Sequence, residues 1–245
     1  MRTLPLLASA LALSAFAACG DDSGSGTDAS HADSPNGSDG SGGQHITVSG
    51  ATADAFGNPV VSATVAAYLQ SDDSQISTTT SDGTTGAFSV AVPYSGTAVA
   101  IYLKGTKTGQ IDTYLYPPAS LSADLGNVPL LIIDMNTETL LLNAAGATQT
   151  PGDGLIGLEV EDPTTAPIAG AMISSTPAGT YRYDAASSST PSPDATVTGQ
   201  DGRAYVISVA PGAVTVNATM TGKTFAPTAV KARPDVLTLT TVIGQ

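Results

Sequence analysis

Short runs of alternating apolar and polar residues fill the chain from residue 45 to its C-terminus, and this pattern constrains the fold most. Residues 61–65, 88–92 and 99–103 are examples, and such runs are broken by Gly, Pro or Asp. A period of two over four to eight residues is typical of strands with one face in a core and the other in water. Thr and Ser at the outward positions fit this arrangement. The pattern predicts an all-β fold built from short strands.

Composition excludes several other classes of protein. Only 12% of the 245 residues are charged, whereas Gly (26) and Pro (16) are frequent. Coiled coils and long exposed helices need Glu, Lys and Arg, so this composition argues against them. The net charge is −13 and Lys and Arg together number 8, so we expect no nucleic-acid partner.

The N-terminal residues have the features of a bacterial export signal. A basic start at Arg2 is followed by the apolar residues 4–18, which lead directly into the single cysteine, Cys19. This apolar stretch is shorter than the roughly 20 residues of a permanent spanning helix, so a cleaved signal fits better. Residues 16–19 read Phe-Ala-Ala-Cys and resemble the lipobox of bacterial lipoproteins, with Phe16 in place of the usual Leu.

The lipobox resemblance implies that Cys19 carries a diacylglycerol thioether, becomes the mature N-terminus and is N-acylated. Two or more acyl chains give a stable anchor, so the implied partner at this end is a membrane. Gly20, rather than Asp, follows the cysteine, which favours the outer membrane in the best-known sorting rule. We expect residues 1–18 to be a lipoprotein signal peptide and the mature protein to lie in the cell envelope. An ordinary signal peptide and a retained anchor over residues 4–18 are the alternatives.

Residues 19–44 are predicted to be a disordered tether. They are rich in Gly, Ser and Asp, and such a segment buries too little apolar surface to fold. A coil of this length and composition would hold the folded part about 25–30 Å from the membrane. A calcium loop over residues 33–39 is excluded because Pro35 stands where a ligand is needed.

The rest of the chain contains one pattern twice, at a spacing of 108 residues. Asp54 and Pro59 recur in this register as Asp162 and Pro167. Further pairs at the same spacing are Val48 and Ile156, Thr52 and Val160, Ala63 and Ala171, and Val65 and Ile173. Several matches in one register predict two homologous domains.

A turn continues the repeat at a wider spacing. We match Asp82-Gly83 of the first copy with Asp201-Gly202 of the second. The spacing widens because the second copy has a longer loop over residues 181–200, which is rich in Ser and Pro. In each copy, the Asp of the 108-residue register is expected to accept backbone N–H bonds, and the small Ala to let two sheets approach.

The shared motif resembles the carboxypeptidase regulatory-like domains, which are transthyretin-like β-sandwiches found beside carboxypeptidases and on many bacterial surface proteins. It runs strand, Asp, loop, Pro-(Val/Ile)-x-x-Ala-x-(Val/Ile), long loop, Asp-Gly turn and further strands. The resemblance implies two tandem transthyretin-like sandwiches over residues 45–135 and 151–245, and we expect the second to fold alone. It implies no particular activity.

A short helix and linker are predicted to join the sandwiches over residues 136–150. Asn136 or Thr137 is the expected N-cap, and Gly146 is the expected C-terminal stop. Leucines and an alanine between these positions supply an apolar patch.

Histidine is nearly absent, which excludes much familiar chemistry. His31 lies in the predicted tether and His45 at the edge of the first domain, so we expect no Ser-His-Asp arrangement inside a domain. The sequence has no HExxH motif, and one cysteine forms no multi-Cys metal site. We therefore expect no catalytic residue, no metal centre, no cofactor and no enzymatic activity.

Tyrosines supply one group of candidate ligand residues. Tyr181, Arg182 and Tyr183, in the long loop, are a candidate surface for a sugar or peptide. Further candidate stacking residues are Tyr102, Tyr114 and Tyr116. The alternative for all of them is a packing role.

Carboxylates supply the other group. Glu159, Glu161 and Asp162 lie close together in the sequence, and Ca²⁺ takes carboxylate and carbonyl oxygens. These three residues are therefore candidate calcium ligands. The alternative is that they are solvated charges at a strand edge.

The sequence does not disclose a biochemical activity. The leading hypothesis is a non-catalytic, lipid-anchored cell-surface protein with an adhesive, structural or scaffolding role. The alternative is a module that binds extracellular polysaccharide or peptide through loops at the sandwich ends. An enzyme with unrecognised carboxylate chemistry is the third hypothesis, and it would show paired acids converging in a pocket.

Overall fold

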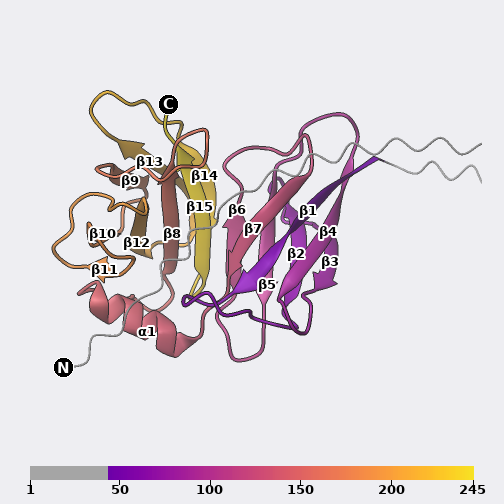
Figure 1. Ribbon diagram of the computed structural model, residues 1–245, viewed down its shortest axis with the longest axis horizontal. Coiled ribbons are helices and arrows are strands. Elements are labelled where there is room, and N and C mark those ends of the chain that lie inside the picture. Colours follow the sequence, from indigo (N-terminus) through magenta and orange to yellow (C-terminus); the bar gives the residue numbers. More distant parts are fainter. Residues whose placement is uncertain (1–43) are drawn as a thin grey trace, which may run out of the picture. The chain divides into compact units, whose positions relative to one another are not determined.

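The computed structural model describes residues 44–245, which form fifteen β-strands and one α-helix (Figure 1). This content confirms the predicted all-β class. The predicted signal peptide of residues 1–18, the lipidation site Cys19 and the predicted tether up to residue 43 lie outside the described residues. Within residues 44–245, no helix has the length and apolar character needed to cross a bilayer.

Seven strands precede the helix and eight follow it. The first group is β1 (Gln44–Ala53), β2 (Thr64–Leu69), β3 (Gln75–Thr80), β4 (Ala87–Tyr94), β5 (Ile101–Thr106), β6 (Thr113–Tyr116) and β7 (Leu125–Leu131), followed by helix α1 (Met135–Ala144). The second group is β8 (Gly154–Glu161), β9 (Met172–Thr176), β10 (Thr180–Asp184), β11 (Pro191–Ser192), β12 (Arg203–Val209), β13 (Gly212–Thr219), β14 (Thr228–Ala232) and β15 (Leu237–Ile243).

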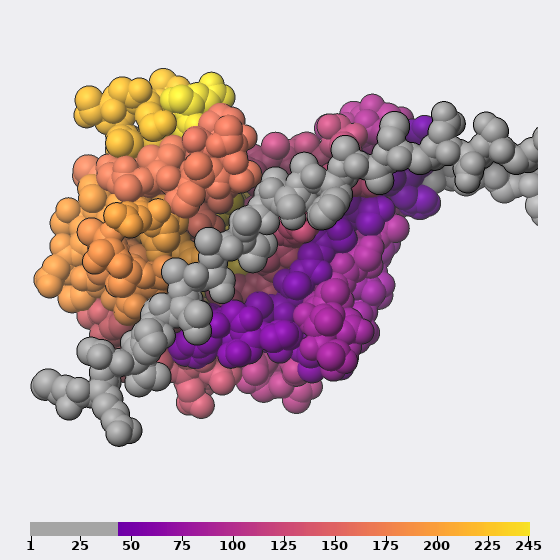
Figure 2. Space-filling view, in the orientation of Figure 1, coloured from indigo at the N-terminus to yellow at the C-terminus, as the bar shows by residue number. Residues whose placement is uncertain are grey.

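The strands form three sheets that make two sandwiches. A three-stranded sheet of order β4-β1-β7 belongs to the first half, and one of order β14-β13-β9 belongs to the second. The third sheet has nine strands, in the order β11-β10-β12-β8-β15-β6-β5-β2-β3, and therefore runs through both halves. The two tandem sandwiches thus share one sheet. In Figure 2 the residues of the second half, coloured orange to yellow, lie next to those of the first half, coloured indigo to magenta.

Each sandwich has its own apolar core, and the alternating pattern of the strands places the core residues. In the first, Ile46, Val48 and Leu130 are at most 2% exposed; in the second, Ile156 and Val216 are fully buried. Burying a side chain of this size contributes about 1.5–3 kcal/mol each relative to leaving it in water. The alternation therefore carries most of the information about which face of each strand is inside.

The same hydrogen bonds from backbone N–H groups to an aspartate side chain occur in both copies of the 108-residue pattern. Asp54 Oδ1 accepts hydrogen bonds from the N–H groups of Phe56 (2.8 Å) and Asn58 (2.9 Å), as expected for a carboxylate that closes a turn. In the second copy, Asp162 Oδ1 accepts from Thr164 (2.8 Å) and Ala166 (3.1 Å) in the same way. The smaller partners of the motif, Ala63 and Ala171, are both fully buried, which also agrees with the prediction.

The match of Asp82-Gly83 with Asp201-Gly202 is wrong. Gly86, not Gly83, is the counterpart of Gly202: both have φ of +70°, and their carbonyls accept from the N–H groups of the equivalent residues Thr52 and Val160. A Cβ on Gly86 or Gly202 would lie 2.6 or 2.5 Å from the carbonyl oxygen of those same residues. Close approach and left-handed backbone, rather than a hairpin corner, therefore require glycine here.

Helix α1 begins earlier than the sequence indicated. Its N-cap is Asp134, whose Oδ1 atom accepts a 2.7 Å hydrogen bond from the N–H of Thr137, so the expected caps Asn136 and Thr137 lie inside the helix. The aspartate satisfies one of the free N–H groups of the first turn. The predicted stop is right, because Gly146 has φ of +58° just after the helix.

Candidate functional site

Two parallel strands, one from each half, join the sandwiches. β15 pairs with β6 from Leu237 opposite Thr113 to Thr240 opposite Tyr116. On its other side β15 pairs in parallel with β8 over its whole length. The hydroxyl of Thr240 also donates a 3.0 Å hydrogen bond to the carbonyl of Tyr116. The last strand of the chain is therefore the seam of the nine-stranded sheet.

A layer of tyrosines lies beside this seam on the first half. The ring of Tyr102 stacks on those of Tyr68 and Tyr116, with 5.1 Å between ring centroids in each pair, and Tyr114 is tilted against it at 5.8 Å. Tyr102 and Tyr116 are 3% and 4% exposed and belong to the same buried cluster as Val230 of β14. Rings from the first half thus complete the core of the second.

Arg233, which directly follows β14, reaches across into the tyrosine layer. Its guanidinium carbon lies 4.1 Å from the ring centroid of Tyr114 and 4.8 Å from that of Tyr102. It also donates a 2.8 Å hydrogen bond to the hydroxyl of Tyr116. A guanidinium placed over aromatic faces is attracted by the ring quadrupoles, by about 0.5–2 kcal/mol for each well-placed pair.

Asp73 completes this group from the loop between β2 and β3. Its Oδ1 atom accepts hydrogen bonds from Arg233 (3.1 Å) and from the hydroxyl of Tyr102 (3.0 Å), and its Oδ2 atom is bonded to the ammonium of Lys231. Asp73 belongs to the first half and both cations belong to the second. We name this set, from Asp73, Tyr102, Tyr114, Tyr116, Lys231 and Arg233, the Arg233 cluster.

The charges of the Arg233 cluster reinforce one another. The hydrogen bond from Lys231, helped by that from Tyr102 and opposed by burial, holds the pKa of Asp73 below its ordinary value. Burial works against the charged form of Arg233, but the hydrogen bond to Tyr116 and the neighbouring rings raise its pKa. Burial raises the pKa of Tyr102. Asp73 and Arg233 are therefore charged and Tyr102 is neutral at physiological pH.

The candidate surface of Tyr181, Arg182 and Tyr183 lies on strand β10 rather than in the long loop, and its side chains make internal contacts. The Tyr181 hydroxyl accepts a 3.0 Å hydrogen bond from the N–H of Ser175. Arg182 Nε donates a 2.7 Å hydrogen bond to the carbonyl of Ala145 at the C-terminus of α1. Tyr183 is 5% exposed. Cations near helix C-termini stabilise them, so Arg182 holds the helix to the sheet.

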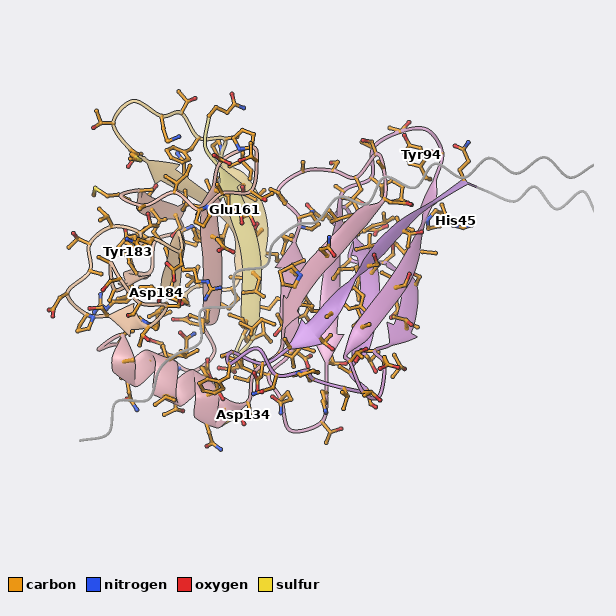
Figure 3. All side chains as sticks on the ribbon, viewed as in Figure 1. His45, Tyr94, Asp134, Glu161, Tyr183 and Asp184 are labelled. Carbon is orange, nitrogen blue, oxygen red and sulfur yellow. The ribbon has the colours of Figure 1, made fainter. Side chains whose placement is uncertain are left out.

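The candidate calcium ligands do not converge. Glu159 lies 3.9 Å from the guanidinium of Arg203, and Asp162 is used by its own turn. Burial, followed by the charges of Glu159 and Asp162, raises the pKa of Glu161 to about 7. Glu161 lies at the end of β8, well away from Asp184 at the end of β10 (Figure 3). Within residues 44–245, no three His, Cys, Asp or Glu side chains are grouped so that they would hold a metal ion.

One surface groove is lined by hydroxyl groups. It has a volume of about 510 Å³ and lies at the ends of β2 and β5. Its lining residues are Ser62, Thr64, Thr106, Lys107, Thr108 and Asp112. The Lys107 ammonium is held by the carbonyl of Val61 at 2.8 Å, so this groove presents mainly hydroxyls and one carboxylate.

Comparisons with known proteins give only distant likenesses. No family model and no curated protein matches the chain. It is similar to a streptococcal ancillary pilin (14% identity, TM-score 0.27, 82% of this chain and 62% of that one). It is also similar to the shaft pilin SpaA of Lactobacillus rhamnosus GG (14%, 0.26, 82% and 97%) and to the TIE protein of Bacillus anthracis (10%, 0.26, 82% and 34%).

The chain spans less than two thirds of the length of the ancillary pilin. These TM-scores are too low to assign the chain to the fold of any of these proteins.

Sequence reasoning found the tyrosines of the Arg233 cluster but not its charged members. Tyr102, Tyr114 and Tyr116 were expected to be stacking residues for a ligand, whereas in the structure they stack on one another and on Arg233. One signal was present: basic residues are so scarce in this chain that Lys231 and Arg233, two residues apart, stand out.

Proposed function

We propose that this chain is a non-catalytic, lipid-anchored protein of the cell envelope whose two sandwiches act as one rigid body with a structural or adhesive role. The observation that carries the proposal is the nine-stranded sheet that runs through both sandwiches by way of the β15–β6 pair. Such a body, on a tether from Cys19, would present a surface of fixed shape away from the membrane, within the reach of the tether.

A shared sheet makes the pair stiffer than two domains on a linker. Domains joined only by a linker move relative to one another as the default. Here, bending at the junction would break the hydrogen bonds between β15 and β6 and pull Arg233 out of the tyrosine layer. The Arg233 cluster therefore supports the sheet from one side, with Asp73 bridging to both cations of the second half.

The rigid body is tested by distance measurements between spin labels. We would place single cysteines at the exposed positions Ser89 on β4 and Thr215 on β13, in a chain carrying Cys19→Ser. Double electron–electron resonance should give one narrow distribution of the distance between the two labels. A broad distribution in the otherwise native chain would contradict the proposal, and Arg233→Ala should broaden it.

The lipid anchor has a separate test, because the proposed lipidation site is Cys19. Cells expressing the full chain would be given a fatty acid with an alkyne tag. We expect the label in the native protein and not in Cys19→Ser, which should leave the membrane fraction in a high-salt wash. A Cys19→Ser protein that stays with the membrane would show that another segment anchors it.

We further propose that the two sandwiches belong with the tandem carboxypeptidase regulatory-like domains of bacterial lipoproteins. The support is the motif itself, in which Asp54 and Asp162 make the same turn bonds and Ala63 and Ala171 are buried alike.

Binding of extracellular polysaccharide is the second candidate function, and the hydroxyl-lined groove favours it. Sugars are recognised by hydrogen bonds from a few well-placed polar groups, and Thr64, Thr106 and Thr108 supply hydroxyls along one groove. A glycan and cell-wall-fragment array should give signals that Thr106→Val removes. Absence of any signal with the native protein would leave the structural role alone.

A further inference from the structure

Two carboxyl groups of the second sandwich have buried oxygen atoms without a hydrogen-bond partner. The side chain of Asp184, which follows Tyr183 at the end of β10 (Figure 3), is fully buried. Its Oδ1 atom accepts a 3.0 Å hydrogen bond from the hydroxyl of Tyr205. Its Oδ2 atom has no partner, and neither has the buried Oδ2 atom of Asp201. Carboxylate oxygens are strongly disfavoured in this state, so the two atoms require a proton or a cation.

The two orphaned atoms belong to neighbouring groups. The chain just before Asp201 lies against Asp184, since a Cβ on Gly199 would be 3.3 Å from the carbonyl oxygen of Asp184. A side-chain hydrogen bond with Asp201 is also one of the causes that raise the pKa of Asp184. One proton placed between them satisfies both, because the protonated acid donates to the other carboxylate. Burial, together with Asp201, raises the pKa of Asp184 to about 7.

The nearest cation, Arg203, lowers the pKa of Asp184 through its charge but makes no hydrogen bond to either orphaned oxygen. From β12, Tyr205 contributes its hydroxyl, and Arg203 contributes a guanidinium that lies 3.9 Å from Glu159 of β8. On β10, the guanidinium of Arg182 is bonded to the C-terminal carbonyls of α1. The segment between the two aspartates contributes one more acid, Asp194, and no Lys, Arg or His.

The pair lies at the base of a long surface segment. Residues 185–200, which include β11, begin directly after Asp184 and end directly before Asp201. The two ends are close, since a Cβ on Gly199 would lie 2.9 Å from the carbonyl oxygen of Ala185. We propose that Asp184 and Asp201 share one proton, and that this proton closes the base of the 185–200 segment.

Loss of the proton leaves two like charges facing each other at this base. In the unfolded chain an aspartate titrates near its ordinary pKa of about 3.9. Between that pH and about 7, the folded protein therefore holds one more proton than the unfolded chain. The stability that the pair contributes is complete below this window and is lost as the pH rises through it. The unfolding constant increases by up to about tenfold per pH unit.

Carbon-detected NMR of the side-chain carboxyls in the native protein gives the direct test. We expect the Asp184 signal to titrate near pH 7. In Asp201→Asn, an amide replaces the acid and removes one negative charge, so the Asp184 pKa should fall by one unit or more. Asp194→Asn, at an exposed position in the same segment, is the matched control and should leave the titration unchanged.

Hydrogen exchange reports on the base of the segment. After correction for intrinsic rates, amides of residues 185–200 should lose protection between about pH 4 and 7 in the native protein. Asp184→Asn carries an amide donor where the proton lies, so its protection should not depend on pH. Glu161, also titrating near 7, is unchanged in both proteins, and the difference between them isolates the pair.

Three outcomes would overturn the proposal. In the first, the Asp184 carboxyl titrates near 4; in the second, it keeps its raised pKa in Asp201→Asn, so burial alone explains it. In the third, millimolar Ca²⁺ shifts the pH at which the Asp184 carboxyl titrates, so a cation rather than a proton lies between the two carboxyls. Failure of the rigid-body proposal would leave all these readouts unchanged, because the pair lies within the second sandwich.

Discussion

The two sandwiches share one hydrogen-bonding skeleton but distribute their strands differently. In the first, β4-β1-β7 faces the four strands β3-β2-β5-β6; in the second, five strands, β11-β10-β12-β8-β15, face β14-β13-β9. The difference lies in the strand after the motif: β3 pairs with β2, whereas β10 crosses to the other sheet and pairs with β12. The shared motif therefore determines how its own strands pair, whereas the sheet that the next strand, β3 or β10, joins depends on the local sequence.

A glycine just before β10 permits the close approach that its crossing requires. Gly179, directly before β10, lies so close to β12 that a Cβ would be 2.6 Å from the carbonyl oxygen of Ile207. In the 108-residue register the first copy has Ser71 at this position, and the chain there turns back instead onto β2. Because Gly179 has no side chain, the chain of the second copy can approach β12 there, and β10 extends the sheet that contains β12.

The largest losses of stability are expected from alanine substitutions at the equivalent positions Gly86 and Gly202. Alanine at either position adds left-handed strain and a clash with a backbone carbonyl, so each variant should lose about 4 kcal/mol of unfolding free energy. Urea denaturation followed by circular dichroism measures the loss. Gly57→Ala, where φ is +82° but no atom lies within 4 Å of the added Cβ, is the control and should lose only about 1 kcal/mol. Equal losses at Gly57 and Gly202 would contradict the close-packing explanation.

The coupling between the two sandwiches is tested at Arg233. Arg233→Ala removes the stacking and leaves Asp73 and Tyr116 without their shared partner, so we expect a loss of about 3 kcal/mol. Arg233→Lys keeps the charge but not the planar contact and should recover about half of this. Calorimetry should then show two transitions in Arg233→Ala where the native protein shows one. A single transition in both proteins would mean that the β15–β6 pair couples the sandwiches alone.

The smallest expected effects are at Ser81 and Thr198, whose hydroxyls make equivalent hydrogen bonds to the backbone in the two cores. Ser81 Oγ accepts from the N–H of Ala63 (2.9 Å) and donates to the carbonyl of Val60 (3.2 Å). Thr198 Oγ1 accepts from Ala171 (2.9 Å) and donates to Ile168 (2.7 Å).

Ser81→Ala leaves the buried N–H of Ala63 without a partner, while the carbonyl of Val60 keeps its hydrogen bond from Thr52. Thr198→Val leaves the N–H of Ala171 and the carbonyl of Ile168 without their partner. Each variant should lose about 2 kcal/mol, measured by urea denaturation. Ser89→Ala, at an exposed strand position, is the control and should change stability by less than about 0.5 kcal/mol. A large loss at one site and none at the other would mean that the two cores are not equivalent.

Most of the features that depend on residues close together in the sequence were predicted correctly. Alternation located the strands, the 108-residue register located the copies, and the turn role of Asp54 and Asp162 followed from the reach of a short carboxylate. Errors arose where several nearby residues offered the same chemistry. Asn136 and Thr137 are reasonable caps, but Asp134 reaches the N–H of Thr137 first.

Long-range pairings left little trace in the sequence. β6 and β15 are ordinary alternating strands, and either edge would pair with many partners, so nothing local indicates that they meet. Tyr102 looked like a ligand platform because exposed and buried tyrosines follow the same strand pattern. Asp184 and Asp201 lie seventeen positions apart in the sequence, and only the closure of residues 185–200 brings their carboxyls together.

The position of β15 decides when this protein can finish folding. It is synthesised after the other fourteen described strands, yet it lies between β8 and β6 in the middle of the nine-stranded sheet. Until residues 237–243 emerge, two strand edges stay open, and open edges promote aggregation. A frameshift that removes β15 would therefore yield an insoluble product with two open strand edges.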